Sequence, residues 1–89
     1  MTTRIHKYQI PAVANLKVAM PAGAKILSFQ LQKGIPTIWA EVDPAARPVE
    51  RRFVAYGTGK DLPPPERRAY VGTYQCDGGE TVWHVFEEL

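Results

Sequence analysis

The sequence predicts an all-β protein, a small antiparallel sandwich or barrel of about seven short strands. The first observation is that residues 24–43 alternate apolar and polar side chains on both sides of Lys33-Gly34, as a β-hairpin does. The second is that residues 68–88 repeat this design around Asp77-Gly78-Gly79. The third is the lack of a helical apolar repeat over three turns, so we expect no such helix between residues 24 and 59.

Two short strands are predicted ahead of the first hairpin. Residues 4–10 are rich in β-forming side chains, and Pro11 ends this strand. Residues 16–20 alternate apolar and polar side chains and predict a second strand, which is followed by the turn Pro21-Ala22-Gly23.

The two strands of the first hairpin each have one apolar face. Between residues 24 and 32 the alternation brings three apolar side chains into phase, namely Leu27, Phe29 and Leu31. Between residues 35 and 43 the corresponding set is Ile38, Ala40 and Val42. Residues 43–48 are predicted to be a loop, because the prolines at its two ends exclude regular strand pairing.

Three further strands complete the domain. Residues 49–57 form a strand that ends in the Gly57-Thr58-Gly59 turn. Residues 60–66 contain Pro63-Pro64-Pro65, which predicts a stiff extended segment and not a helix. The last two strands are predicted over residues 68–76 and 80–88.

Length and composition indicate a single domain over residues 1–89. A chain of this size buries only about 60% of its unfolded surface, so self-association would add to its stability. Cys76 is the one cysteine, which excludes an internal disulfide and fits a reducing compartment. The first ten residues lack an apolar signal-peptide core, and no apolar run approaches the roughly 20 residues of a membrane span. We therefore expect a cytoplasmic protein with no membrane contact.

The net charge of +2 by itself predicts no nucleic-acid partner, but the charges are unevenly distributed. Residues 1–40 contain five basic residues and no acid, whereas residues 41–89 contain all nine acids and six bases. This division can create a positive face. Alternatively, the lysines at strand edges keep the protein soluble and discourage edge-to-edge pairing.

Two tryptophans are predicted to lie out of phase with apolar neighbours. Trp39 alternates with the apolar set of its strand and therefore points to the polar side. In the last strand Val82, His84 and Phe86 share one face, and Trp83 points to the other. A tryptophan on a polar face needs cover from a loop, a second copy of the chain or a ligand. These three explanations remain open, and we expect a homo-oligomer, most simply a dimer, built on the Trp39 face or on an edge of the first hairpin.

Two arginine pairs are candidates for binding an anion. Arg51-Arg52 and Arg67-Arg68 lie near the starts of two strands, and adjacent strand residues point to opposite faces. One arginine of each pair could therefore converge near the Gly57-Thr58-Gly59 turn, where guanidinium groups and backbone N–H groups would suit a phosphate. The alternative is surface pairing with Glu50, Glu66, Glu87 and Glu88. The candidate ligand site comprises Arg51, Arg52, Gly57, Thr58, Gly59, Arg67 and Arg68, with Trp39 for stacking.

The chain has few residues suited to catalysis. Cys76 and His84 lie on opposite arms of the second hairpin, which suggests a nucleophile and its base. A cysteine without a third group is more often an inert core residue, and His84 in phase with apolar neighbours fits a hydrogen-bonded core histidine. Neither a Cys-x-x-Cys nor a His-x-x-x-His pair is present, so we expect no metal site. No enzymatic activity and no cofactor are expected.

Three stretches resemble a family of small uncharacterised proteins of tailed bacteriophages and prophages. These stretches are AKILSFQLQKGIPTIWAEVD, RRFVAYGTGKDL and YVGTYQCDGGETVWHVFEE, and the resemblance spans roughly residues 4–88. It implies expression in the cytoplasm of a host bacterium during infection or lysogeny, and it implies no mechanism. Where relatives have a histidine after the Gly-Thr-Gly turn, this chain has Lys60.

Three functional hypotheses follow from this setting. The first is a non-enzymatic binding protein, an anti-defence factor that sequesters a nucleotide signal or blocks a host defence protein. The second is a virion or assembly component whose strand edges pair with other phage proteins. The third, ranked last, is a small enzyme that uses His84. The sequence leaves open the ligand, the host target and the number of subunits.

Overall fold

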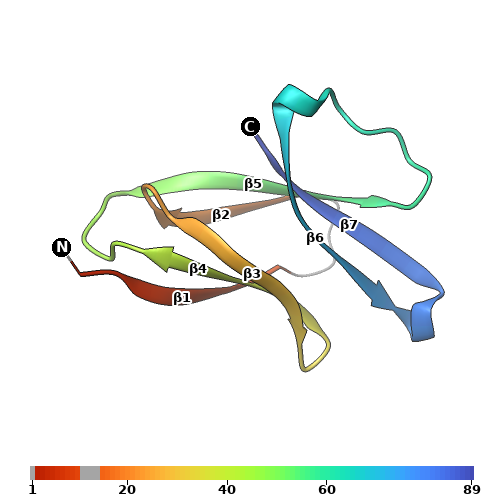
Figure 1. Ribbon diagram of the computed structural model, residues 1–89, viewed down its shortest axis with the longest axis horizontal. Helices are drawn as coiled ribbons and strands as arrows, with labels where there is room; N and C mark the ends of the chain where they lie inside the picture. The colour runs from red at the N-terminus through yellow and green to blue at the C-terminus, as the bar shows by residue number, and fades with distance from the viewer. Residues whose placement is uncertain (1, 11–14) are drawn as a thin grey trace.

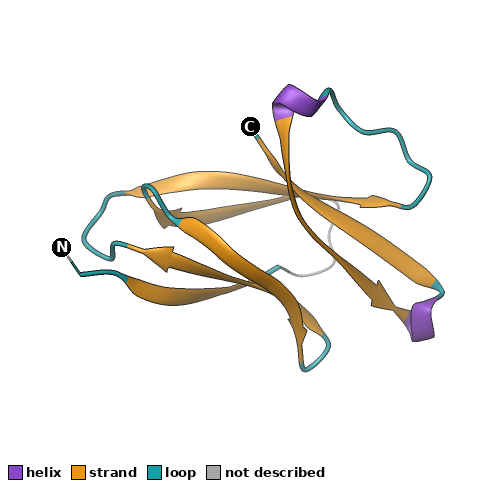
Figure 2. Cartoon of the chain, in the orientation of Figure 1, coloured by secondary structure: helices purple, strands orange, loops and turns teal. Residues whose placement is uncertain are grey.

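The computed structural model of the protein describes residues 2–10 and 15–89. Its seven strands (Figure 1) are β1 (Arg4–Gln9), β2 (Asn15–Pro21), β3 (Lys25–Gln32), β4 (Ile35–Val42), β5 (Pro48–Gly57), β6 (Arg68–Cys76) and β7 (Thr81–Glu88). Helix in the described residues is limited to two single 3-10 turns (Figure 2), η1 (Pro65–Arg67) and η2 (Asp77–Gly79). None of these helices is long and apolar enough to cross a membrane.

The strands form two antiparallel sheets that pack as a sandwich. The three-stranded sheet has the order β1-β4-β3, and the four-stranded sheet has the order β2-β5-β7-β6. The predicted all-β antiparallel fold is therefore confirmed, as a sandwich and not as a closed barrel. The predicted strands agree with the observed ones to within one residue at each end. Pro11, which was predicted to end the first strand, lies outside the described residues.

Both predicted hairpin turns are confirmed. Lys33 and Gly34 have φ values of 50° and 79°, and two consecutive residues with positive φ are what a tight two-residue hairpin turn requires. Asp77, Gly78 and Gly79 also have positive φ, and they form η2 between β6 and β7. Each turn contains glycine, which adopts the left-handed region without steric cost, next to one non-glycine residue in the same region, Lys33 or Asp77.

In the proline segment after β5, Pro64 is extended, as predicted. Pro64 has φ −53° and ψ 145°, which are polyproline values. The prediction that the extended segment runs on to Glu66 is wrong, because η1 begins at Pro65. A proline is tolerated at the first position of a helical turn, where its missing N–H would have no partner in any case.

The core lies between the two sheets. The predicted apolar face of β4 is confirmed, because Ile38, Ala40 and Val42 are all buried. The four-stranded sheet contributes Phe53 and Val85, among others, to the same cluster. These side chains come from strands distant in the sequence, so their burial depends on the packing of one sheet on the other.

A bulge in β3 corrects one predicted face. The strand pairing shifts between Ile26 and Ser28, so Ile26 lies opposite Ala40 and Phe29 lies opposite Ile38. Ile26 therefore packs against the core, whereas Leu27 is 48% exposed. One extra residue in a strand reverses which alternate side chains face inward beyond it. The prediction that Leu27 belongs to the apolar face is therefore wrong.

The faces of β7 are the reverse of those predicted. Trp83 shares the inner face with the buried Val85 and packs against the core, so the second sheet covers it. His84 and Phe86 lie on the outer face, and the expectation that His84 is a core histidine is wrong. β7 is central in its sheet, between β5 and β6, and has apolar residues on both faces, so alternation alone could not identify the inner one.

Candidate functional site

The outer face of the four-stranded sheet carries three aromatic rings, which we call the aromatic row: Tyr56 on β5, Phe86 on β7 and Tyr70 on β6. The centroids of Tyr56 and Phe86 are 5.9 Å apart, and those of Tyr70 and Phe86 are 5.4 Å apart, both in edge-on arrangements. Strand register explains the contact, because Tyr70 lies directly opposite Phe86 and Tyr56 lies opposite the preceding outward residue, His84.

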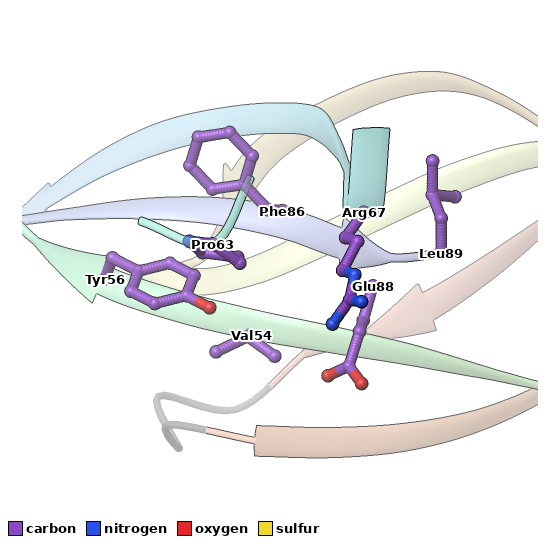
Figure 3. A pocket seen from close by; sticks show the side chains of 7 residues that line it. All are labelled: Val54, Tyr56, Pro63, Arg67, Phe86, Glu88 and Leu89. Carbon is purple, nitrogen blue, oxygen red and sulfur yellow. The ribbon is translucent and has the colours of Figure 1, made fainter. Parts of the chain in front are cut away.

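The segment between β5 and β6 loops away from the sheet (Figure 1), and we call it the arching segment. Its residues line two adjoining grooves together with Tyr56 and Phe86. The larger groove, of about 410 Å³, is shown in Figure 3; its lining is Val54, Tyr56, Pro63, Arg67, Phe86, Glu88 and Leu89. The smaller groove, of about 220 Å³, is lined by Tyr56, Gly57, Thr58, Gly59, Lys60, Leu62, Tyr70, His84 and Phe86. Tyr56 and Phe86 belong to both grooves, which therefore adjoin at these two rings.

Arg68 fixes the arching segment to the sheet. Its guanidinium carbon lies 5.2 Å from the centroid of the Phe86 ring, a cation–π distance. Its Nε donates a hydrogen bond of 2.8 Å to the carbonyl oxygen of Pro63. The backbone N–H of Leu89 also donates to the carbonyl of Arg67 at 2.9 Å. The grooves are therefore bounded by a segment that is tied at several points.

His84 ties the Gly57-Thr58-Gly59 turn to the neighbouring strand. Its Nε2 lies 2.7 Å from the Thr58 hydroxyl, and its Nδ1 lies 3.0 Å from the Thr73 hydroxyl. The Thr73 hydroxyl is 2.5 Å from the Tyr70 hydroxyl. Both ring nitrogens of His84 thus have protein partners. Its evident role is to hold Thr58 in place at the end of the smaller groove.

The structure distributes the predicted ligand-binding residues over several places. Gly57, Thr58 and Gly59 line the smaller groove, and Arg67 lines the larger one. Arg52 and Arg68 share the outer face, in one cross-strand row with Glu88 between them, but this row lies five residues along β5 from Gly57. The predicted convergence of the arginines at the Gly57-Thr58-Gly59 turn is therefore wrong. Arg52 lines neither groove, and Arg68 positions the arching segment.

Arg51 lies away from this site, on the inner face. Its Nε and one terminal nitrogen donate to the two carboxylate oxygens of Glu87 at 2.6 and 2.7 Å, and its other terminal nitrogen donates to the carbonyl of Ala24 at 2.6 Å. Hydrogen bonding to Glu87 raises the pKa of the Arg51 guanidinium, against the opposing effect of partial burial. Arg51 is thus a structural residue that joins β5 and β7 to the connection between β2 and β3.

Trp39 is also remote from the grooves. It lies on the outer face of the three-stranded sheet, in register between Lys7 of β1 and Ser28 of β3. Ile5 and Leu27 on this sheet are 63% and 48% exposed. Trp39 therefore cannot stack on a ligand bound in the grooves beside Tyr56.

Cys76 and His84, the two residues considered for catalysis, lie on opposite faces of their sheet. Cys76 lies opposite Thr81 and points inward with Tyr74, whereas His84 points outward opposite Thr73, so Cys76 and His84 do not form a nucleophile–base pair. Within residues 2–10 and 15–89, no three His, Cys, Asp or Glu side chains gather in a group that could hold a metal ion.

The aromatic row and Glu88 are site residues that were not predicted from the sequence. The sequence does contain a pattern that indicates them. Alternation along a strand puts Arg52 and Tyr56 on the same face of one strand, and puts Phe86 and Glu88 on the same face of another strand. Trp39 was predicted as the stacking residue instead, because a tryptophan on a polar face is the more conspicuous feature. Only the strand order shows that Tyr56, Tyr70 and Phe86 are neighbours.

This geometry defines a class of protein: a small antiparallel β-sandwich with an aromatic groove beneath one connecting segment. The chain belongs to the family described as a domain of unknown function (DUF7352), whose family model matches residues 1–89. Comparison with curated proteins finds no match. Comparison with solved structures finds none either.

Proposed function

We propose that the protein is a non-enzymatic binding protein that takes an anionic nucleotide into the two grooves beneath the β5–β6 segment. The observation that carries the proposal is that both grooves share the Tyr56 and Phe86 rings, while one cationic side chain lines each groove, Arg67 the larger and Lys60 the smaller. Stacking of a base on an aromatic side chain contributes about 1–3 kcal/mol. Lys60 and the Gly57–Gly59 turn line the smaller groove, where a phosphate would be attracted to the ammonium group.

The resemblance to small phage proteins suggests the biological setting of this proposal. A protein that binds a nucleotide signal in the host cytoplasm lowers its free concentration and acts as an anti-defence factor. That role requires tight binding and no turnover. It is consistent with the arrangement of His84, whose two nitrogens face the neutral hydroxyls of Thr58 and Thr73 and no carboxylate.

A second candidate function rests on the opposite side of the molecule. The outer face of the three-stranded sheet combines Trp39 with the exposed Ile5 and Leu27. Aromatic and aliphatic residues on a polar surface are typical of protein–protein contacts. This face would serve a protein that blocks a host partner, or a virion or assembly component.

Isothermal titration calorimetry against linear and cyclic nucleotides tests the proposal. We expect at least one nucleotide to bind, and we expect Lys60→Ala to weaken every nucleotide that binds about tenfold to a hundredfold, the effect of losing a charge-assisted contact of roughly 1.5–3 kcal/mol. The loss should shrink as salt rises, because ions screen the contact in the unmutated protein too. Lys17→Ala is the matched control, since Lys17 lies on the four-stranded sheet but lines neither groove. If no nucleotide binds at millimolar concentration, the proposal is wrong, and the protein-binding function becomes the leading candidate.

A further inference from the structure

The end of the larger groove that lies away from the aromatic rings carries one cation and one anion. Arg67 and Glu88 lie together there, with the rings of Tyr56 and Phe86 toward the other end (Figure 3). Within the described residues, ion pairs shorter than 4.0 Å join Lys17 to Glu50 and Arg51 to Glu87, and none involves Arg67 or Glu88.

The hydrogen-bonding capacity of these two side chains is therefore available to a ligand. An ionised carboxylate only accepts hydrogen bonds, and a guanidinium only donates them. A flat ring in this groove would have to present N–H donors to Glu88 and acceptors to Arg67. To satisfy both carboxylate oxygens, the ring needs two neighbouring donors.

Guanine is the common base that meets this requirement. Its N1–H and N2 amino groups are adjacent donors, and its O6 and N7 atoms are acceptors on the next edge, which an arginine can bind bidentately. Adenine has one amino donor flanked by acceptors, so one of these would face a carboxylate oxygen of Glu88. The volume of the groove, about 410 Å³, is within the range of about 300–1,000 Å³ that is usual for small-molecule sites.

We propose that the larger groove binds the base of a guanine nucleotide, and this inference rests on the proposed function above. Glu88 accepts hydrogen bonds from N1–H and the N2 amino group, and Arg67 donates to O6 and N7. The base lies against Tyr56 and Phe86. Because these two rings also line the smaller groove, the ribose and phosphate extend into it toward Lys60. The larger groove thus selects the base, and the smaller groove attracts the phosphate.

Calorimetry of the intact protein with GMP, IMP and AMP tests this assignment. These probes carry the same phosphate and differ in the edge of the base, and IMP lacks only the N2 amino group of GMP. We expect GMP to bind more tightly than AMP by at least about tenfold, with IMP between them, because each lost contact to a charged group costs about a factor of ten or more.

Variants of Glu88 and Arg67 test whether these residues cause the preference for GMP over AMP. Glu88→Gln should weaken GMP about tenfold or more while AMP changes little, because the amide keeps one acceptor and gains a donor that clashes with N1–H or N2. Glu50→Gln is the matched control, since Glu50 is a glutamate on the same sheet that lines neither groove. Arg67→Ala should likewise reduce the preference for GMP, and it provides a second test if Glu88→Gln does not fold.

The outcomes separate this inference from the proposed function. If AMP and GMP bind equally well, or if Glu88→Gln binds GMP as the unmodified protein does, the assignment of guanine is wrong and nucleotide binding stands. If none of the nucleotides binds, both proposals fail.

Discussion

At the scale of single residues, Arg51 and Arg52 show how one position in a strand changes the role of a side chain. Adjacent strand residues point to opposite faces, so Arg52 is exposed on the outer face while Arg51 points between the sheets. Burial of the Arg51 guanidinium is compensated by both carboxylate oxygens of Glu87 and by the carbonyl of Ala24. A bidentate arginine–carboxylate pair with an added backbone acceptor is among the stronger arrangements for a partly buried charge.

We expect Arg51→Ala to lower the free energy of unfolding by about 3 kcal/mol, because it leaves the Glu87 carboxylate shielded and without its partner. The two side chains are only 19% and 13% exposed, so water replaces the lost contacts poorly. Chemical denaturation monitored by tryptophan fluorescence measures the change.

The pair formed by Lys17 and Glu50 provides the matched control for this experiment. These two side chains are 3.5 Å apart and more than half exposed, so Lys17→Ala should cost less than about 1 kcal/mol. Equal losses for Arg51→Ala and Lys17→Ala would contradict the structural role of Arg51.

At the scale of elements, β3 and β6 make the contact that joins the two sheets on one side. Phe29 of β3 packs edge-on against Tyr74 of β6, with 6.0 Å between the ring centroids. It also lies over Gly72, where a Cβ atom would come within 2.4 Å of the Phe29 ring. Gly72 is therefore a glycine because of close packing, and a positive φ plays no part.

Gly72→Ala should destabilise the protein by about 1–3 kcal/mol, the usual cost of forcing an extra methyl group into a packed contact. Thermal unfolding followed by circular dichroism measures this loss of stability. Gly57→Ala is the control, because a Cβ at Gly57 would meet its nearest neighbours at 3.8 and 3.9 Å, which are ordinary contact distances. Combining Gly72→Ala with Phe29→Leu should recover part of the loss; if it does not, the contact with Phe29 is not the cause.

At the scale of the whole molecule, the sandwich is open and thin. Its radius of gyration is 13.5 Å, whereas a compact domain of this length has a value of about 12 Å. Its accessible surface is 5859 Å², compared with about 5,200 Å² expected for a protein of 10.0 kDa. The excess surface favours association, and the Trp39 face, with the exposed Ile5 and Leu27, contributes to it.

We therefore expect a homodimer through the Trp39 face or an edge of the first hairpin. Trp39→Ala should weaken the dimer by about 2–4 kcal/mol if Trp39 is a hot spot of the interface. Light scattering at tens of micromolar, where a dimer of ordinary affinity is intact, measures the state of both proteins. Tyr70→Ala is the control, since Tyr70 is an exposed aromatic residue on the other sheet. A monomer in the unmutated protein at that concentration would rule out this assembly.

The strands, the two tight turns and the apolar face of β4 could be predicted from the sequence, because these depend on local conformation and on alternation within one segment. The inner face of β7, the position of the β3 bulge and the separate locations of Arg51 and Trp39 emerge from the packing of the two sheets. The reason is that a period of two defines two faces and does not say which one another sheet will cover. The candidate site shows the same division. The turn at Gly57–Gly59 and Arg67 were predicted from the sequence, whereas the grouping of Tyr56, Tyr70 and Phe86 required the strand order, which depends on pairing between residues far apart in the chain.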